Sequence, residues 1–334
     1  MEENADKCGT ILAGIAMRWD MSVSLVAIDY SRPAQRLFKL PSREGTIHSI
    51  FRRAMNIAID DTMLTLLSSE LPRMPNSLRL SSSRLEELLR GAQPGLKVQV
   101  GDGRLLIPAC NFSLRLSEAY PWEPRPALAA CHWHPETVAW HTLLLARYLN
   151  NRPQPGGLMP LLGPLLLGQR EPDIPLAQLA LPRLLLLARA SSRHDREGIE
   201  EATRGLAGLG PGLTPAGDDA LAGFAAVMAL LSPYISVDAA PGNFIAETIA
   251  ISARTRTTAL SAALIMHAAR GEVAEHLGSL LLALALPAEA SETVLFTADR
   301  LLAFGATSGG DTLLGTLLGL RVLEAGFDDD LYGL

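Results

Sequence analysis

Apolar and polar residues alternate along much of the chain between Met21 and Ser117. The segment from Met55 to Ile59 alternates, reaches Asp60-Asp61, and continues as the apolar segment Thr62 to Leu67. A period of two places alternate side chains on opposite faces of a strand, and a short acidic turn reverses the chain. The pattern therefore predicts a β-hairpin.

Further strands follow in the same region. Val98 to Val100 and Arg104 to Ile107 flank Gly101-Asp102-Gly103, which predicts a hairpin with a three-residue loop. Residues 112–117 alternate again and predict another strand. One short helix interrupts the strands: Ser83 and Glu86 have capping-box spacing, and Gly91 ends an apolar face that includes Leu85 and Leu88. The sequence predicts an antiparallel sheet or small barrel.

The spacing of apolar residues changes after three prolines, at positions 121, 124 and 126. Apolar residues then recur at helical spacing, with one stretch broken by Pro and Gly at 153–187. The predicted helices cover residues 136–149, 196–206, 220–231, 244–252, 258–270, 272–286, 291–304 and 313–323. We predict an α+β protein, with a β-rich domain at 1–120 and a C-terminal α-helical bundle at 121–334.

The composition narrows the possible functions. The chain has 334 residues, 48% of them hydrophobic, and a formal net charge of -6 without a basic stripe, which argues against nucleic-acid binding. Three separate cysteines indicate a reducing compartment, and the acidic start is unlike a signal peptide. The longest apolar runs fall short of the ~20 residues that span a bilayer. We therefore expect a cytoplasmic protein that does not bind membranes.

Two segments share an uncommon pattern of glycine, threonine and aspartate. Residues Gly208 to Asp219 read Gly-Leu-Gly-Pro-Gly-Leu-Thr-Pro-Ala-Gly-Asp-Asp, and Gly305 to Leu314 repeat Gly-x-Thr-x-x-Gly-Asp-x-x-Leu. Each segment precedes an apolar helix, and glycine-rich helix starts provide free N–H groups for anions. The simpler interpretation is helix capping by Thr and Asp. The repetition predicts two helix starts that converge on one site.

Three carboxylates in these segments are the candidate catalytic groups: Asp218, Asp219 and Asp311. If the two helix starts meet, these side chains could hold Mg²⁺ together with waters and phosphate oxygens. Alternatively, one of them orients a substrate amide or takes its proton. The sequence does not decide between these two roles, and the metal stays unknown.

A third segment, from Ser252 to Thr258, carries two guanidinium groups and several hydroxyls at the start of a predicted helix. Such groups bind phosphate or carboxylate, although a capped helix with solvated arginines explains them equally well. The segment is similar to the Ser-Thr-Arg-Thr-Arg loop of aspartate and ornithine carbamoyltransferases, but His134-Pro135 precedes it here, whereas that family's His-Pro follows. The candidate substrate- and anion-binding residues are Thr214, Gly217, Arg254, Thr255, Arg256, Thr257, Thr258, Thr307 and Gly310.

Residues Cys131 to His134, with Glu136 and His141 beyond them, have metal-ligand residue types. Their spacing matches no usual zinc pattern, and His134-Pro135-Glu136 is also an ordinary helix start. His267 and His276 lie in apolar segments, where packed or surface roles are the expectation. We treat this group as a minor metal candidate.

The twelve residues from Gly208 to Asp219 resemble the signature of the AllH family, which includes a subunit of the oxamate carbamoyltransferase of anaerobic allantoin degradation. The order of a β-rich part, an Arg-Thr-Thr segment and a later Gly-Gly-Asp fits this resemblance. It implies a carbamoyltransferase component in purine catabolism that acts with two larger partner subunits on a small anionic substrate, converting oxalurate and phosphate into oxamate and carbamoyl phosphate. The amides of Gly217 and Gly310 would then stabilise charge on the carbonyl oxygen.

Two other functions remain open. Helical ADP-ribosylglycohydrolases place Asp-Asp and Gly-Asp pairs at helix starts, and Gly310-Asp311-Thr312 resembles their last motif. That likeness implies a Mg²⁺-dependent hydrolase, although the paired first motif has no match here. A non-catalytic scaffold subunit, in which the glycine segments dock a partner, fits the small-residue helices as well.

Overall fold

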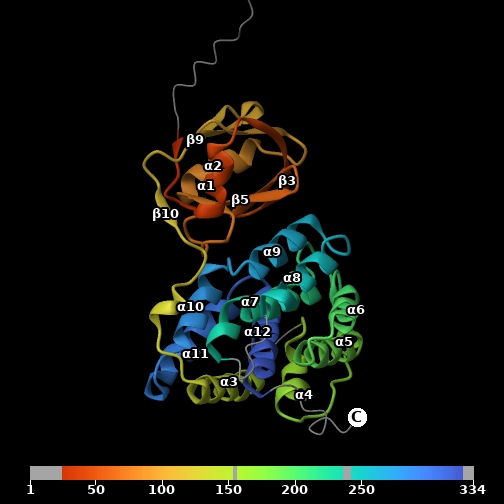
Figure 1. Cartoon of the computed structure of the whole chain (residues 1–334). Coiled ribbons are helices and arrows are strands. Elements are labelled where there is room, and N and C mark those ends of the chain that lie inside the picture. Colours follow the sequence, from red (N-terminus) through yellow and green to blue (C-terminus); the bar gives the residue numbers. More distant parts are fainter. Residues whose placement is uncertain (1–24, 153–155, 236–241, 326–334) are drawn as a thin grey trace, which may run out of the picture.

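The computed structural model describes residues 25–152, 156–235 and 242–325 of the chain. The protein is α+β: a curled ten-stranded sheet forms the N-terminal part, and helices form the rest (Figure 1). The sequence predicted that a β-rich part precedes a helical part, because apolar residues recur with a period of two in the first part of the chain and a period of 3.6 in the second.

The sheet is mixed. Its spatial order is β1-β9-β8-β7-β3-β4-β5-β6-β2-β10, with parallel pairs β1/β9, β5/β6 and β2/β10. The predicted antiparallel pairing holds for the other neighbours in this order and fails for these three pairs, because local alternation does not report which distant strand becomes a neighbour. β1 and β10 stand at opposite ends of the order, so the described strands form an open curl and not a closed barrel. The strands are β1 Leu25–Val26, β2 Asp29–Ser31, β3 Arg43–Phe51, β4 Ala54–Ile59, β5 Thr62–Ser68, β6 Ser77–Leu80, β7 Lys97–Gly101, β8 Arg104–Ile107, β9 Phe112–Arg115 and β10 Tyr120–Trp122.

Both predicted hairpins form, each around a two-residue turn. Ile59 pairs with Thr62 across Asp60-Asp61. In the second hairpin Gly101 pairs with Arg104, so Gly101 belongs to the strand, and the predicted three-residue loop was one residue too long. The turn residues Asp102 and Gly103 have φ values of 48° and 78°. Aspartate and glycine tolerate this left-handed region, which tight hairpin turns require.

Two helices accompany the sheet. The helix α1, Arg32–Lys39, was not predicted; the Ser31 hydroxyl caps it by accepting a hydrogen bond from the Ala34 amide at 3.2 Å. The helix α2, Ser82–Gly91, ends where predicted but begins earlier, at a cap position occupied by Ser81. Ser83 is therefore already helical, and the predicted capping box was wrong.

The sheet and its helices share one buried apolar cluster. Ile57 and Leu64 come from the central strands, and Phe38 and Leu85 come from α1 and α2. Each of these side chains is at most 3% exposed, and burying one such side chain stabilises the fold by about 2 kcal/mol. The core of the N-terminal part is thus independent of the helices that follow.

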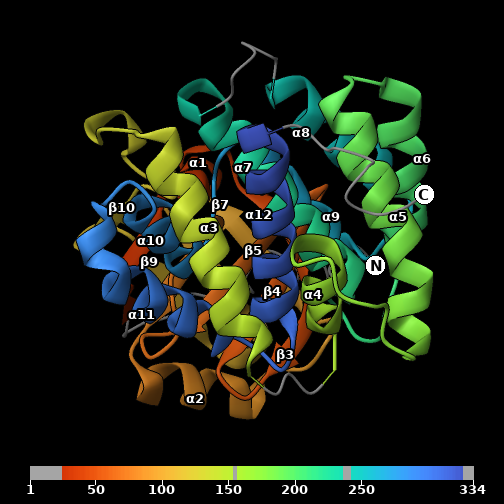
Figure 2. The ribbon, with the colours of Figure 1, turned by 90° about the horizontal axis from the view of Figure 1, so that it is seen from below.

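In the described residues of the second part there are ten α-helices. The bounds are α3 Pro135–Asn150, α4 Leu162–Leu166, α5 Pro175–Ser192, α6 Arg196–Leu206, α7 Ala216–Ile235, α8 Gly242–Ala253, α9 Ala259–Ala269, α10 Glu275–Ala283, α11 Ser291–Leu302 and α12 Ser308–Ala325. They share a second buried apolar cluster, rich in Leu and Ala. Seen from below, α12 and α7 lie near the centre, with the other helices around them (Figure 2).

The two central helices begin earlier than the sequence indicated. α7 starts at Ala216 and α12 at Ser308, so Asp218, Asp219 and Asp311 lie in first helical turns and not in preceding loops. By length and composition α7 is apolar enough to cross a membrane, but 78% of its apolar window is buried inside the protein. We conclude that α7 is the core helix of the second part.

A partly buried ion-pair network joins the two parts. The Arg73 guanidinium lies 3.0 Å from the Asp29 carboxylate on β2 and 2.7 Å from the Glu275 carboxylate on α10. The Arg73 amide and carbonyl also bond to Glu275, and the Val273 amide donates to the Pro124 carbonyl at 3.0 Å. β10 ends at Trp122, and we propose the domain division near residue 120 because the two apolar clusters lie on either side of it.

Candidate functional site

Glycines let α7 and α12 approach until their backbones touch. A Cβ atom on Gly223 of α7 would overlap the Thr312 carbonyl of α12, and a Cβ on Gly315 of α12 would overlap the Ala220 carbonyl of α7. A close reciprocal crossing of this kind is possible only without side chains at both positions. It brings together the first turns of helices whose starts lie far apart in the sequence.

The two helix starts are also built alike. A Cβ on Gly217 would overlap the Leu206 carbonyl at the end of α6, and a Cβ on Gly309 would overlap the Leu301 carbonyl near the end of α11. In each helix the crossing glycine follows six positions later, at Gly223 and Gly315. By these contacts Gly217 is equivalent to Gly309, so the structural partner of Asp311 is Asp219, one residue beyond the partner that the sequence pattern suggested.

The two starts meet through their hydroxyl groups and their carboxylates. The Thr214 and Ser308 hydroxyls lie 3.1 Å apart and hydrogen-bond to each other. Asp219 and Asp311 are close enough for their charges to repel. The predicted convergence of the two glycine segments is therefore confirmed.

Asp218, in the first turn of α7, ties two loops together. It is 1% exposed; its Oδ1 accepts a hydrogen bond from the Gly208 amide at 2.9 Å, and its Oδ2 accepts one from the Thr257 hydroxyl. Burial raises the pKa of this carboxyl, while the bonds from Thr257, Gly208 and Ser261 act in the opposite direction. This carboxylate holds the loop before α7 against the loop between α8 and α9.

Of the three acids in the site, Asp219 has the most strongly raised pKa. Burial raises its pKa to about 8; the Ser308 and Thr214 hydroxyls oppose the shift, and the charges of Asp311 and Asp218 add to it. Its Oδ2 atom is buried without a hydrogen-bond partner. At neutral pH Asp219 is therefore mostly protonated and neutral, so that it can donate a hydrogen bond or a proton.

Asp311 is fully buried on the α12 side. Its Oδ1 accepts a hydrogen bond from the Leu158 amide at 2.5 Å, and its Oδ2 has no partner. Burial raises its pKa to about 6, although the bonds from Leu158 and Thr307 lower it. At pH 7 Asp311 is mostly ionised while Asp219 is mostly protonated, so the site pairs a proton acceptor with a proton donor.

Sequence reasoning missed the glycines before α4. Gly157 has a φ of 66°, and a Cβ on it would overlap the Asp311 carboxyl group; a Cβ on Gly156 would lie 3.3 Å from the Thr307 methyl group. These glycines let the chain pass directly over the start of α12 and aim the Leu158 amide at Asp311. The only sequence signal was the adjacent glycine pair, which we interpreted as a break in an apolar stretch.

The predicted anion segment divides between the interior and the surface. Thr257 binds Asp218, and the Thr258 hydroxyl caps α9 and donates to the Leu213 carbonyl at 2.7 Å. Arg254, Thr255 and Arg256 are exposed. The Arg254 guanidinium pairs at 2.9 Å with Asp61 in the β4–β5 turn, and their side chains are 60% and 89% exposed. The structure thus joins the Thr257 hydroxyl to Asp218, places Arg254 at the rim between the two parts, and leaves Thr255 and Arg256 exposed.

The amides at the start of α7 are already used. The Gly217 amide donates to the Leu209 carbonyl at 2.9 Å, and the Asp218 and Asp219 amides both donate to the Pro215 carbonyl. The Gly217 amide therefore does not offer the free donor that the sequence suggested. Gly310 packs against the Met159 side chain, and its predicted role remains a prediction.

The histidine and cysteine group does not form a metal centre. The described residues contain no group of three or more His, Cys, Asp or Glu side chains that could hold a metal ion. Trp133 stacks on Tyr234 with ring centroids 5.5 Å apart, and the buried His141 ring faces the Leu284 carbonyl at 3.2 Å. His267 pairs with Glu272 at 2.6 Å. These contacts account for packing, and within the described ranges the carboxylate site likewise offers no ligand set for Mg²⁺.

The fold and the site define an α+β protein whose helical part buries three acids beneath hydroxyl-bearing loops. The chain belongs to the AllH family: residues 24–121 match the AllH family N-terminal domain, and residues 206–320 match the oxamate carbamoyltransferase subunit AllH. The second match spans both glycine segments and the loop between α8 and α9. No solved structure matches the chain. As a member of a family named for a subunit, the protein is expected to have partner subunits.

Proposed function

We propose that the protein is a cytoplasmic subunit of an oxamate carbamoyltransferase of allantoin and purine catabolism. The observation that carries this proposal is the family match at residues 206–320, which covers all three buried acids. This subunit would act together with two larger partner subunits, and the substrates of the assembled enzyme would be oxalurate and phosphate. The Mg²⁺-dependent hydrolase has no comparable support.

The proposed reaction moves a carbamoyl group from nitrogen to oxygen. A phosphate oxygen attacks the terminal carbamoyl carbon of oxalurate, the C–N bond breaks, and carbamoyl phosphate and oxamate form. The hydrogen phosphate loses a proton, and the departing amide nitrogen gains one. A neutral acid beside an ionised one suits this exchange, because one group can donate while the other accepts. Asp219 and Asp311 form such a pair.

Positive charge for the phosphate would come from the loop that carries Arg254 and Arg256. This loop is adjacent to the acids, since its Thr257 binds Asp218, and a Cβ on Gly208 would lie 2.8 Å from the Arg256 carbonyl. Guanidinium groups bind phosphate through paired N–H donors. A partner subunit that covers this rim would enclose the bound phosphate.

A non-catalytic scaffold role is favoured by one specific observation: all three carboxylates are at most 7% exposed. In this role the buried acids would fasten loops together, as Asp218 does through Gly208 and Thr257. In that case Asp219 would affect stability and assembly but not the rate of the assembled enzyme.

The test uses the three-subunit assembly with oxalurate and phosphate, and it measures carbamoyl phosphate. The proposal expects production that requires this chain and drops at least tenfold with Asp219→Asn. Asp173→Asn, an exposed acid far from the site in sequence, serves as the control and should leave the rate unchanged. An assembled enzyme with full activity in the Asp219 variant would favour the scaffold role, and no carbamoyl phosphate from the wild-type assembly would reject the proposed reaction.

A further inference from the structure

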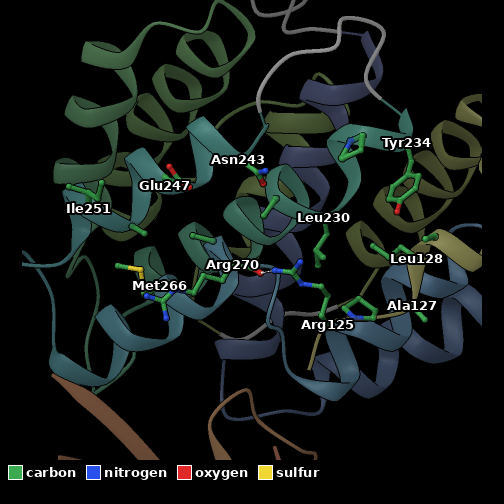
Figure 3. Close-up of a pocket in the computed structure, with 16 residues that line it drawn as sticks. Arg125, Ala127, Leu128, Leu230, Tyr234, Asn243, Glu247, Ile251, Met266 and Arg270 are labelled. Atoms are coloured by element: carbon green, nitrogen blue, oxygen red, sulfur yellow. Dashed lines mark hydrogen bonds between the residues drawn. The ribbon is translucent and has the colours of Figure 1, made fainter. Parts of the chain in front are cut away.

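A groove on the helical part lies outside the acid site. It has a volume of about 750 Å³ and is bordered by α7, α8, α9 and the segment that follows β10. Asn243, Glu247 and Ile251 lie along one wall, and Arg125 and Arg270 lie along the other (Figure 3). Nothing in the proposed chemistry uses these residues.

The α8 wall has the dimensions of a helix-binding surface. Asn243, Glu247 and Ile251 are spaced at four-residue intervals, so they share one face of α8 over about 12 Å, at 1.5 Å per residue. Ile251 is 68% exposed although it is a large apolar side chain. Apolar side chains left exposed beside a groove mark surfaces that bind other proteins.

The groove is apolar at its ends and charged in its middle. Figure 3 shows Ile251 and Met266 at one end, and Tyr234 and Leu128 at the other. Small residues form part of the lining between them, including Ala229, Ala250 and Ala269. Apolar groups at both ends of a groove fit the apolar positions of an amphipathic helix, which recur at i and i+7.

The charged middle restricts the sequence of the occupant. The Arg125 guanidinium is held in place because it donates to the Arg270 carbonyl at the end of α9. The two guanidinium groups therefore place positive charge on one wall, with Arg125 held in place, and Glu247 lies on the other wall. A bound helix needs an acidic residue facing the arginines and benefits from a basic residue facing Glu247.

We propose that this groove binds an amphipathic helix of a partner subunit, with apolar residues for the two ends of the groove and an acidic residue between them. The inference rests on the proposed function, because the family name implies partner subunits. The occupant is a protein segment and not a small metabolite, since Arg125, Glu247, Ile251 and Arg270 are all exposed, and only a large partner would remove them from water.

The experiment measures the affinity of the full chain for the two partner subunits of the proposed enzyme. Ile251→Glu places a charge at the apolar end, and Arg270→Glu reverses the charge in the middle; each should weaken binding at least tenfold. Phe296→Glu is the matched control, since Phe296 is 61% exposed on α11 and should leave affinity unchanged. Thermal melting curves establish that each variant is folded. Hydrogen exchange should show protection of α8 and the end of α9 on assembly.

The outcomes separate the inference from the proposed function. If both groove variants bind the partner subunits with wild-type affinity, the groove is not their binding site, and the carbamoyltransferase proposal stands. Failure of the wild-type chain to bind the partners would overturn both. Loss of self-association in the groove variants, without loss of partner binding, would assign the groove to a second copy and reject the partner helix.

Discussion

Asp219 and Asp311 lie 92 positions apart in the sequence, and each places a buried Oδ2 atom without a hydrogen-bond partner in the same site. Their charges repel, and this repulsion adds to the burial that raises the pKa of Asp219 to about 8. The relationship depends on the close crossing of α7 and α12. It gives the protein a neutral acid and an ionised acid side by side near pH 7.

The stability of the protein should fall as the pH rises toward 8. An acid whose pKa is higher in the folded state than in the unfolded state stabilises the fold. This contribution is complete below the unfolded pKa, near ~4, and it is lost as the pH rises through the folded pKa. For Asp219 the loss is on the order of a few kcal/mol. Urea unfolding between pH 4 and pH 9 should show the decline, and Asp219→Asn should remove the part above pH 7.

Glu324 provides a matched control, because burial raises the pKa of this second acid to about 7. Glu324→Gln should flatten the decline below pH 7 and leave the part near pH 8. If Asp219→Asn and the wild-type chain lose stability equally between pH 7 and pH 9, the neutral form of Asp219 is not the native one.

Removing the Asp218 side chain should destabilise the protein by about 2–4 kcal/mol. Asp218→Ala leaves the Gly208 amide and the Thr257 hydroxyl without their acceptor, and unpaired buried polar groups are costly. Asp218→Asn keeps one acceptor and should cost less. Denaturant unfolding gives the magnitude, and equal losses in the two variants would contradict this role for the carboxylate.

The glycines at the helix crossing should not tolerate even a methyl group. Gly223→Ala and Gly315→Ala push a Cβ into the facing backbone carbonyl and should each cost about 2 kcal/mol or more. The control is Gly278→Ala in α10, where the added Cβ would meet only the Val273 side chain at 3.5 Å and the Pro126 side chain at 3.8 Å. That variant should be neutral or more stable by up to about 1 kcal/mol, because alanine favours helix more than glycine does.

The exposed Arg254 should matter for phosphate and not for stability. Its pairing with Asp61 is well exposed, so Arg254→Ala should change the free energy of unfolding by less than about 1 kcal/mol. In the assembled enzyme the same variant should raise the KM for phosphate at least tenfold. Arg43→Ala removes a comparable exposed pair with Asp60 and should leave that KM unchanged. Equal phosphate kinetics in both variants would remove Arg254 from the phosphate site.

Local patterns in the sequence were sufficient where neighbours along the chain decide the structure. The alternation of Met55 to Ile59 and the turn at Asp60-Asp61 identified β4 and β5, and α6 was predicted with its observed bounds. The repeated Gly-Asp segments indicated two helix starts that meet, because an uncommon pattern that occurs twice suggests a shared structural role. The same segments carried the resemblance to the family to which the chain belongs.

Distant contacts decided the rest. The parallel neighbours of β1, β6 and β10 depend on how the sheet curls, which no local period reports. The sequence also paired Asp218 with Asp311, whereas the contacts of Gly217 and Gly309 show that Asp219 is the equivalent residue. The exposed Arg254 side chain pairs with Asp61, nearly two hundred positions earlier, and no local pattern reports this contact.

The sequence by itself determined the class of the fold and the two glycine segments that meet with their acids, since periodicity and glycine content are properties of neighbouring positions. Only the tertiary structure decided which of these acids is neutral. Burial and repulsion set a pKa, and both arise from groups that folding brings together from separate parts of the chain.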